Sequence, residues 1–131
     1  MNFDKYKDVA YLLLRIGVGL IFIMSGYGKL TGIEGVVGFF GNIGIPMPGI
    51  MAWVVAIVEF VGGIMVLVGY RVQIPGVLLA IVMLVAIITV KLGADNVFQS
   101  MRLELMLLLA SLYIATSGSG KYSIDDSMGK K

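Results

Sequence analysis

The residue most suited to a chemical role in this sequence is Glu59, the one charged residue in an apolar run from Ile50 to Gly69. A membrane-spanning helix takes about 20 residues, and at about 1.5 Å per residue Glu59 falls near the middle of a hydrocarbon core about 30 Å thick. An unpaired charge at that depth costs at least about 2.5 kcal/mol, so intramembrane acids usually face a bundle interior and have a partner. We therefore expect Glu59 to belong to a buried cluster.

The preceding apolar run offers two basic partners for this carboxylate. Arg15 and Lys29 fall on one face of a helix at about 100° per residue. The sequence predicts that Glu59 pairs with Arg15 or Lys29.

Small residues accompany these charges on both helices. Gly19 and Gly26 share the face of Arg15, and Gly62 and Gly63 follow Glu59 by one turn. Small residues at such spacing let helix backbones approach closely in membrane bundles. We expect the two helices to pack through these glycines.

A second charge group is predicted between the last two apolar runs. Lys91 ends one run, and Arg102 and Glu104 open the next, so an antiparallel hairpin would bring Lys91 near Glu104. In both hairpins a Lys ends the first helix and a Glu lies in the second, as Lys29 with Glu59 and Lys91 with Glu104. This pattern suggests a weak internal repeat of two hairpins. The alternative is that the basic residues extend to lipid headgroups.

The composition places these residues in a membrane protein. The chain of 131 residues is 59% hydrophobic and 14% charged, with a mean hydropathy of +0.99, whereas soluble domains carry roughly 25% charge. Apolar runs at about 9–30, 50–69, 74–92 and 101–117 predict an all-α, polytopic bundle of four transmembrane helices in a single domain, 1–131. Residues 31–49 are apolar but broken by glycines, Pro46 and Pro48, which favours a re-entrant or interfacial segment.

The basic residues predict the orientation in the cell membrane. With the N-terminus inside, six face the cytoplasm and three the opposite side, which favours two cytoplasmic termini in a multi-pass protein. The first group is Lys5, Lys7, Arg71, Lys121, Lys130 and Lys131, and the second is Lys29, Lys91 and Arg102. No basic run carries interleaved aromatic residues, so the expected partner is the lipid bilayer and not nucleic acid.

The chain contains no cysteine and no histidine. This excludes dithiol exchange by the chain itself, zinc binding through Cys or His, histidine ligation of haem, and Ser/His or Cys/His triads. Carboxylates, Lys, Arg, Tyr and Trp53 remain for chemistry. We expect no metal site and no intrinsic cofactor.

Three stretches of the sequence resemble the DoxX family of small four-helix membrane proteins: LLLRIGVGLIFIMSGYGKL, GIPMPGIMAWVVAIVEFVGGIMVLVGYR and GSGKYSIDD. Two positions depart from the family pattern, since many relatives have a histidine at Ser25 and a proline at Ser119. The positions that match the pattern are Arg15, Gly26, Lys29, Glu59, Gly62, Gly63 and Gly69. The resemblance implies membership of sulfur- and redox-linked membrane assemblies, including relatives of thiosulfate:quinone oxidoreductase subunits.

Three functions are compatible with these residues. The first is a subunit of a redox- or sulfur-linked complex, in which Arg15 and Lys29 contact a quinone headgroup or a small sulfur oxyanion and Glu59 orients it or takes up a proton. A quinone is the cofactor of this hypothesis, with redox subunits or a second copy of the chain as partners. The second is a small proton-coupled transporter or channel. The third is a structural or assembly subunit with buried charges and no ligand. Whether the chain catalyses a reaction is left open.

Overall fold

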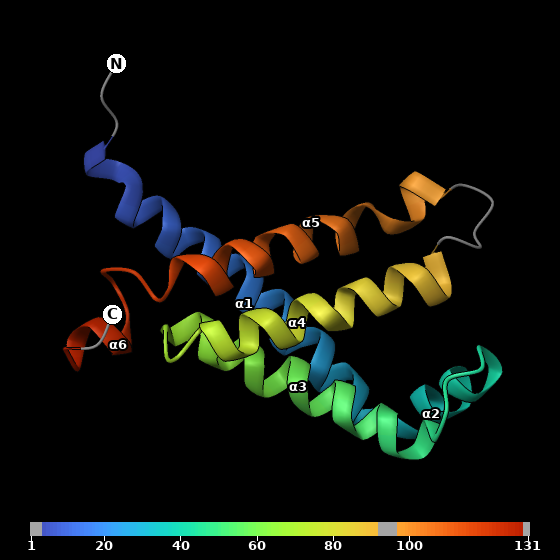
Figure 1. Cartoon of the computed structure of the whole chain (residues 1–131). Coiled ribbons are helices and arrows are strands. Elements are labelled where there is room, and N and C mark those ends of the chain that lie inside the picture. The colour runs from blue at the N-terminus through green and yellow to red at the C-terminus, as the bar shows by residue number, and fades with distance from the viewer. Residues whose placement is uncertain (1–3, 92–96, 130–131) are drawn as a thin grey trace.

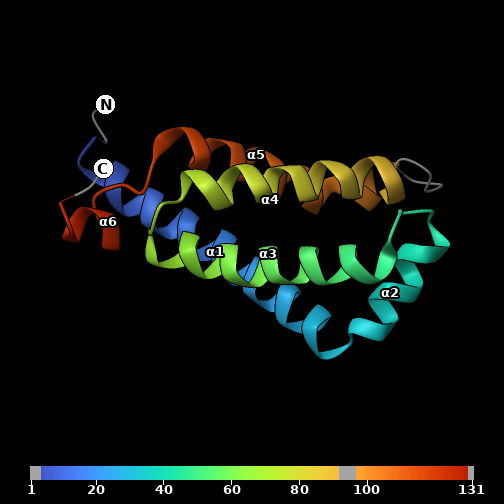
Figure 2. The same ribbon diagram turned by 60° about the horizontal axis from the view of Figure 1, so that its bottom comes forward.

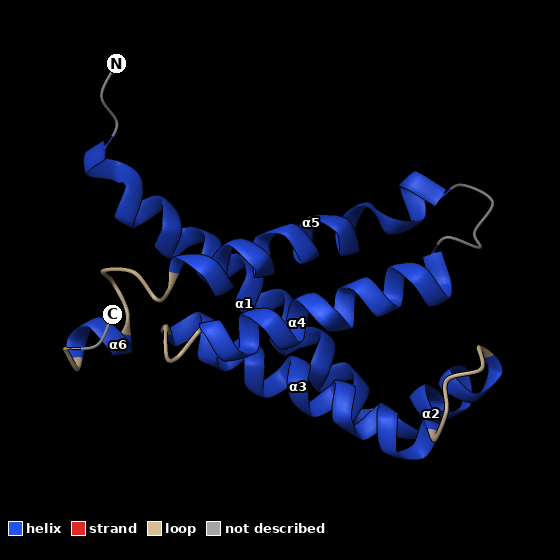
Figure 3. Ribbon diagram, viewed as in Figure 1, coloured by secondary structure: helices blue, strands red, loops and turns tan. Residues whose placement is uncertain are grey.

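Every element in the described part of the chain is a helix (Figure 3). The computed structural model describes residues 4–91 and 97–129, and the side-chain surroundings of 4–89 and 101–129. The elements are a 3₁₀ turn (Asp4–Tyr6), α1 (Lys7–Thr31), α2 (Ile33–Asn42), α3 (Pro48–Val68), α4 (Gln73–Ala86), a π-helical turn (Ile87–Lys91), α5 (Val97–Ser117) and α6 (Ile124–Ser127).

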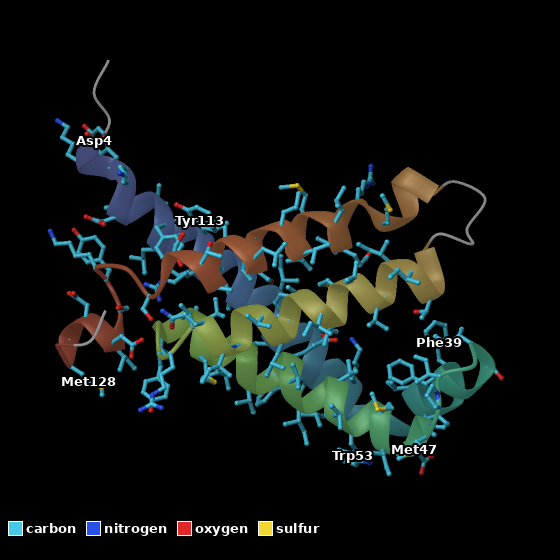
Figure 4. All side chains as sticks on the ribbon, viewed as in Figure 1. Asp4, Phe39, Met47, Trp53, Tyr113 and Met128 are labelled. Atoms are coloured by element: carbon cyan, nitrogen blue, oxygen red, sulfur yellow. The ribbon has the colours of Figure 1, made fainter. Side chains whose placement is uncertain are left out.

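The helices are apolar on their outer faces as well as in their core. Large apolar side chains such as Leu13, Ile57, Ile81 and Leu109 are exposed, and Figure 4 shows Trp53 at the outer edge of α3. A helix that is apolar all round is either buried in the core of a large protein or spans a membrane, and exposed apolar faces on a chain of 131 residues favour the membrane. Within the described residues, Asp4–Thr31 and Pro48–Val68 are long and apolar enough to span it, and Gln73–Thr89 is a shorter apolar helix. The predicted all-α fold is confirmed, whereas the count of four crossings stays a prediction.

The four predicted runs correspond to α1, α3, α4 with its π-helical turn, and α5. The predicted end of the third run, at residue 92, lies outside the described residues. The segment at 31–49 contains α2, whose ten residues extend roughly 15 Å, half of a hydrocarbon core. A helix this short does not cross the bilayer, and its re-entrant or interfacial placement stays a prediction.

The long helices form two antiparallel pairs, α1 with α3 and α4 with α5, and the pairs meet mainly along α3 and α4 (Figures 1 and 2). Helix α2 lies at one end, against the start of α3. The N-terminal and C-terminal segments both lie at the opposite end (Figures 1 and 2). A buried apolar core joins the pairs, and it includes Val18, Phe22, Val66, Leu79, Met83, Leu107 and Ile114.

Glycines set the separation of α1 and α3. A Cβ atom at Gly19 would lie 2.8 Å from the carbonyl oxygen of Gly63, and a Cβ atom at Gly63 would lie 2.8 Å from the carbonyl oxygen of Gly19. At Gly26 a Cβ atom would lie 2.5 Å from the backbone nitrogen of Phe60. The two backbones therefore touch at two points along the interface, as small residues allow in membrane bundles.

Gly62 contacts a different helix from the one expected. A Cβ atom at Gly62 would lie 3.3 Å from Cβ of Pro75 and 3.4 Å from a methyl group of Leu79, both on α4. Consecutive helical residues point about 100° apart, so Gly62 and Gly63 serve two interfaces.

Substitution of the buried Gly26 tests this interface. We expect Gly26→Ala to lower the free energy of unfolding by about 1 to 3 kcal/mol, the usual cost of overpacking, because the new methyl group meets rigid backbone. Gly28→Ala in the same helix is the matched control, since a Cβ atom there meets nothing within 4 Å. Thermal unfolding in detergent measures both, and equal melting temperatures would contradict the close approach.

Candidate functional site

A cavity of about 710 Å³ is lined by residues of both helix pairs and of α2. All five longer helices contribute to its walls, which are mostly apolar and include Phe22, Phe40, Val58, Ile81 and Leu107. Its polar and charged lining residues are Ser25, Lys29, Glu59, Thr89 and Glu104. Mostly apolar clefts of roughly 300 to 1,000 Å³ with a few polar groups are typical of small-molecule sites.

The polar wall is built by the contact of α1 with α3. Ser25 and Lys29 are four residues apart on α1, so their side chains share one face of the helix. Gly26 lies between them and touches the backbone of Phe60, the neighbour of Glu59 on α3. The missing side chain at Gly26 therefore brings the three functional groups within reach of one another.

Lys29 is the candidate partner that reaches Glu59. Its ammonium nitrogen lies 3.1 Å from Oε1 and 3.2 Å from Oε2 of Glu59, and donates a hydrogen bond of 2.8 Å to Oγ of Ser25. The Glu59 side chain is 2% exposed and that of Lys29 is 27% exposed. Burial makes the carboxylate depend on this cation, because a buried charge without a partner is costly. Ser25, the position where the family resemblance expects a histidine, supplies a hydroxyl to the pair.

Arg15 makes different contacts from those expected. The guanidinium is buried, and it donates to the carbonyl oxygen of Val66 at 3.2 Å and to the carbonyl oxygen of Tyr122. Arg15 and Lys29 are separated by roughly 21 Å of helix, so one carboxylate at Glu59 does not serve both. Arg15 instead neutralises carbonyl dipoles near the C-terminal end of α3.

The C-terminal segment, residues 118–129, is held against the ends of α1 and α3. The Asp125 carboxylate accepts hydrogen bonds from the Arg71 backbone N–H at 2.7 Å and from the Ser119 hydroxyl at 2.6 Å. The Asp125 N–H donates to the Gly69 carbonyl at 3.1 Å. These residues were not predicted as a group, although Ser123 capping the Asp126 N–H is readable from the Ser-x-x-Asp spacing.

Aromatic residues hold α1 to α5 at the same end of the molecule. The Tyr11 hydroxyl donates to the carbonyl oxygen of Gly118. The Tyr11 ring packs edge to face on Tyr113 with centroids 5.7 Å apart. The polar contacts at this end thus lie far along the bundle from the cavity.

The second predicted charge group is only partly described. Glu104, on α5, lines the cavity opposite the α1 and α3 walls, and it has an interaction partner of its own. Arg102 is exposed. The side chain of Lys91 lies outside the described residues, and so does its predicted contact with Glu104. Within the described residues, no cluster of three or more acidic side chains forms a metal site.

The sequence is similar to known bacterial membrane proteins along nearly its whole length. The family model described as DoxX matches residues 10–92. "Putative oxidoreductase CatD" of Bacillus subtilis is 40% identical over 93% of this chain and 89% of its own length. "Inner membrane protein YqjF" of Escherichia coli is 32% identical over 97% and 98%, and "Uncharacterized membrane protein Rv3486" of Mycobacterium tuberculosis is 30% identical over 92% and 82%. No solved structure matches the chain significantly.

A double-mutant cycle tests the pair of Lys29 and Glu59. Removing one partner of a buried pair costs about 3 to 5 kcal/mol of folding free energy. Because Lys29 is partly exposed, we expect a cost of about 3 kcal/mol or less for this pair. We expect Lys29→Met and Glu59→Gln each to lower the free energy of unfolding, and the double variant to recover much of the loss. Combining Glu59→Gln with Arg15→Met is the control, and those effects should add within about 0.5 kcal/mol. Additive losses for Lys29 and Glu59 would rule out the coupling.

Gly69 tests how the C-terminal segment is held. Its φ is +75°, and a Cβ atom there would collide with Arg15 Nη1 and Cβ of Ser123. We expect Gly69→Ala to release the segment and to speed tryptic cleavage after the exposed Lys121. Gly44→Ala carries a similar backbone strain at φ +84° but meets nothing within 4 Å, so its cleavage rate should match the wild type. Equal rates in the two variants would show that the segment is not anchored there.

Proposed function

This chain belongs to the DoxX family of membrane proteins, and from that premise we propose that it is the membrane component of a redox-linked system. We propose further that the cavity around Lys29 and Glu59 binds the headgroup of a lipid-soluble quinone. The observation that carries this proposal is a cavity of about 710 Å³ with apolar walls and one charged, hydrogen-bonding wall.

A quinone headgroup matches both kinds of wall. Its ring is flat and apolar, which suits Phe22, Phe40 and the aliphatic side chains. Its carbonyl oxygens accept hydrogen bonds, and an ammonium has three N–H groups to donate. Lys29 donates to Ser25 and Glu59, and its third N–H is available for a ligand carbonyl.

The charges of the cavity favour this ligand over a small sulfur oxyanion. Among the described side chains that line the cavity, one ammonium, Lys29, is accompanied by two carboxylates, Glu59 and Glu104. That ammonium is already paired with Glu59 at 3.1 Å, so an anion would compete with this carboxylate for the one cation of the described lining. Arg15, the second cation that an anion site would need, contacts backbone carbonyls at the other end of the bundle.

Electron transfer in this proposal requires a partner. The chain has no cysteine and no histidine to hold a metal centre or a dithiol. A relative that is 40% identical carries the name "Putative oxidoreductase CatD". We therefore propose that a redox subunit exchanges electrons with the bound quinone, while this chain supplies the membrane site.

We also propose that both termini face the cytoplasm. The six-to-three division of basic residues favours this orientation, and both terminal segments lie at one end of the molecule (Figure 2), as an even number of crossings requires. Fluorescent-protein fusions at residues 1 and 131 should both fluoresce in cells, and alkaline phosphatase fusions there should be inactive. An active phosphatase at either end would contradict the orientation.

Thermal unfolding with short-chain quinones tests the binding site. A ligand at 100 times its Kd stabilises the folded state by about 2.7 kcal/mol, so decylubiquinone should raise the melting temperature of the wild-type protein in detergent. Lys29→Met should abolish the rise, and Ala86→Phe should do so by filling the cavity without removing a charge. Lys121→Met, which removes an exposed lysine at the opposite end, should respond like the wild type.

Two results would overturn the proposal. The first is a wild-type protein that no benzoquinone or naphthoquinone stabilises, which would favour the structural or assembly role. The second is a shift that persists in both Lys29→Met and Ala86→Phe, because the quinone would then bind elsewhere. A shift with thiosulfate or sulfite but not with any quinone would assign the cavity to an oxyanion.

A further inference from the structure

A second hollow lies on the seam where α3 and α4 run side by side (Figure 2). We call it the α3–α4 groove, and its volume is about 150 Å³. Gly62 of α3 and Pro75 of α4, which lie in close contact, form part of its lining, and the side chains of Ile57, Val61 and Ile74 flank them. All of its described lining residues are apolar, so an occupant of the groove has to be apolar as well.

The groove adjoins the cavity. Val58 of α3 and Leu78 of α4 line both hollows. On α3 the cavity lining ends at Glu59, and the groove lining extends from Ile57 to Met65. On the antiparallel α4 the cavity lining begins at Leu78, where the groove lining ends. The two hollows therefore follow one another along the same seam.

Both hollows open on the same outward face of the bundle. Exposed apolar side chains recur at intervals of three or four residues along the seam, which places them on one face of each helix. They are Val54, Ile57 and Val61 on α3, and Ile74, Leu78, Ile81 and Val85 on α4. Val54 and Ile81 line the cavity, whereas Ile57 and Ile74 line the groove. A chain attached to a ligand in the cavity can thus continue along the outer face into the groove.

We propose that the two hollows hold one ligand, a quinone whose ring lies beside Lys29 in the cavity and whose isoprenoid tail lies in the α3–α4 groove. The inference rests on the proposed quinone site. It adds the tail as a second recognised part of the ligand, and it defines the ligand class as quinones that carry an isoprenoid tail.

The size of the groove suits a short piece of such a tail. An apolar hollow of about 150 Å³ holds a group of about the size of benzene. One isoprene unit has five carbon atoms, so the groove accommodates about one unit, with van der Waals contacts on both sides from α3 and α4. The remainder of a longer tail extends into the surrounding lipid.

The covalent link to the ring favours the tail over a lipid chain in the groove. Lipid chains are as apolar as the tail, so the groove gains nothing by removing either one from water. A tail whose ring is already bound enters the groove in an intramolecular step, at a high effective concentration. Because packing alone distinguishes the groove from lipid, we expect the tail to tighten binding by about three- to tenfold.

Photolabelling from the tail tests this placement. A benzoquinone with a diazirine at the end of a tail of two isoprene units, bound to the full-length protein in lipid nanodiscs, should label Ile57, Val61 or Ile74. An excess of the unlabelled two-unit quinone should abolish that label. Ile64, which is exposed on α3 but lines neither hollow, should carry no more label than the exposed Leu109 on α5.

Substitutions in the groove test whether the tail contributes to binding. The measured quantity is the ratio of the dissociation constants of a tailless quinone and the two-unit quinone, both expressed as mole fractions of the membrane so that partitioning into lipid cancels. Val61→Trp fills the groove and should bring this ratio close to one, while the tailless quinone binds as it does to the wild type. Ile64→Trp is the matched control and should keep the wild-type ratio. Ile74→Ala removes one wall at an exposed position and should lower the ratio even if the larger side chain at Val61 prevents folding.

The outcomes distinguish the inference from the proposed function. Equal dissociation constants for the two quinones, or label on Ile64 as strong as on Val61, would overturn the placement of the tail and leave the ring site intact. Label in the groove that excess quinone does not displace would assign the groove to a lipid chain and would also overturn the placement. A wild-type ratio in both Val61→Trp and Ile74→Ala would show that the tail lies elsewhere. Binding of neither quinone would overturn the proposed function itself.

Discussion

The architecture of this protein depends on one carboxylate that has to be neutralised inside an apolar helix bundle. Glu59 is 2% exposed, and Lys29 supplies the compensating charge at 3.1 Å. That contact requires α1 and α3 to approach closely, which the missing side chain at Gly26 permits. Because the pair lies on the wall of a cavity and not in a packed interface, the same constraint leaves a charged group within reach of a ligand.

Arg15, the other basic residue considered as a partner of Glu59, binds backbone carbonyl groups and not a carboxylate. Arg15 joins the carbonyl groups of Val66 and Tyr122, and so fixes the C-terminal segment across the end of α3. The contacts of Gly19 with Gly63 lie between this end and the cavity. One face of α1 thus carries the buried Arg15 at one end and the cavity-lining Lys29 at the other. Rigid backbone contact between them is expected to hold the cavity wall in place when a ligand enters or leaves.

Sequence periodicity predicted the helix face on which the charged residues and glycines lie better than it predicted the residues that they contact. The stripe that contains Arg15, Gly26 and Lys29 follows from 100° per residue, but the residue of α3 that each one meets depends on the offset and tilt of the two helices. For that reason the sequence left Arg15 and Lys29 as alternative partners of Glu59, and Lys29 is the one that contacts it. Gly62 was placed with Gly63, although neighbouring residues face different helices. The cavity was not predicted, because it is formed by the spacing of two helix pairs and by α2, which lies in the segment that Gly and Pro residues had marked as re-entrant or interfacial.

The central claim is that the cavity beside Lys29 and Glu59 is a ligand site open to lipid-soluble quinones. Photoaffinity labelling with an azidoquinone in native membranes, mapped by mass spectrometry, tests it most directly. The account predicts label on residues that line the cavity, such as Phe22, Val58 or Leu107, and loss of that label when unlabelled quinone is added in excess. Label confined to outward-facing positions such as Trp53, or label that excess quinone does not reduce, would contradict the claim.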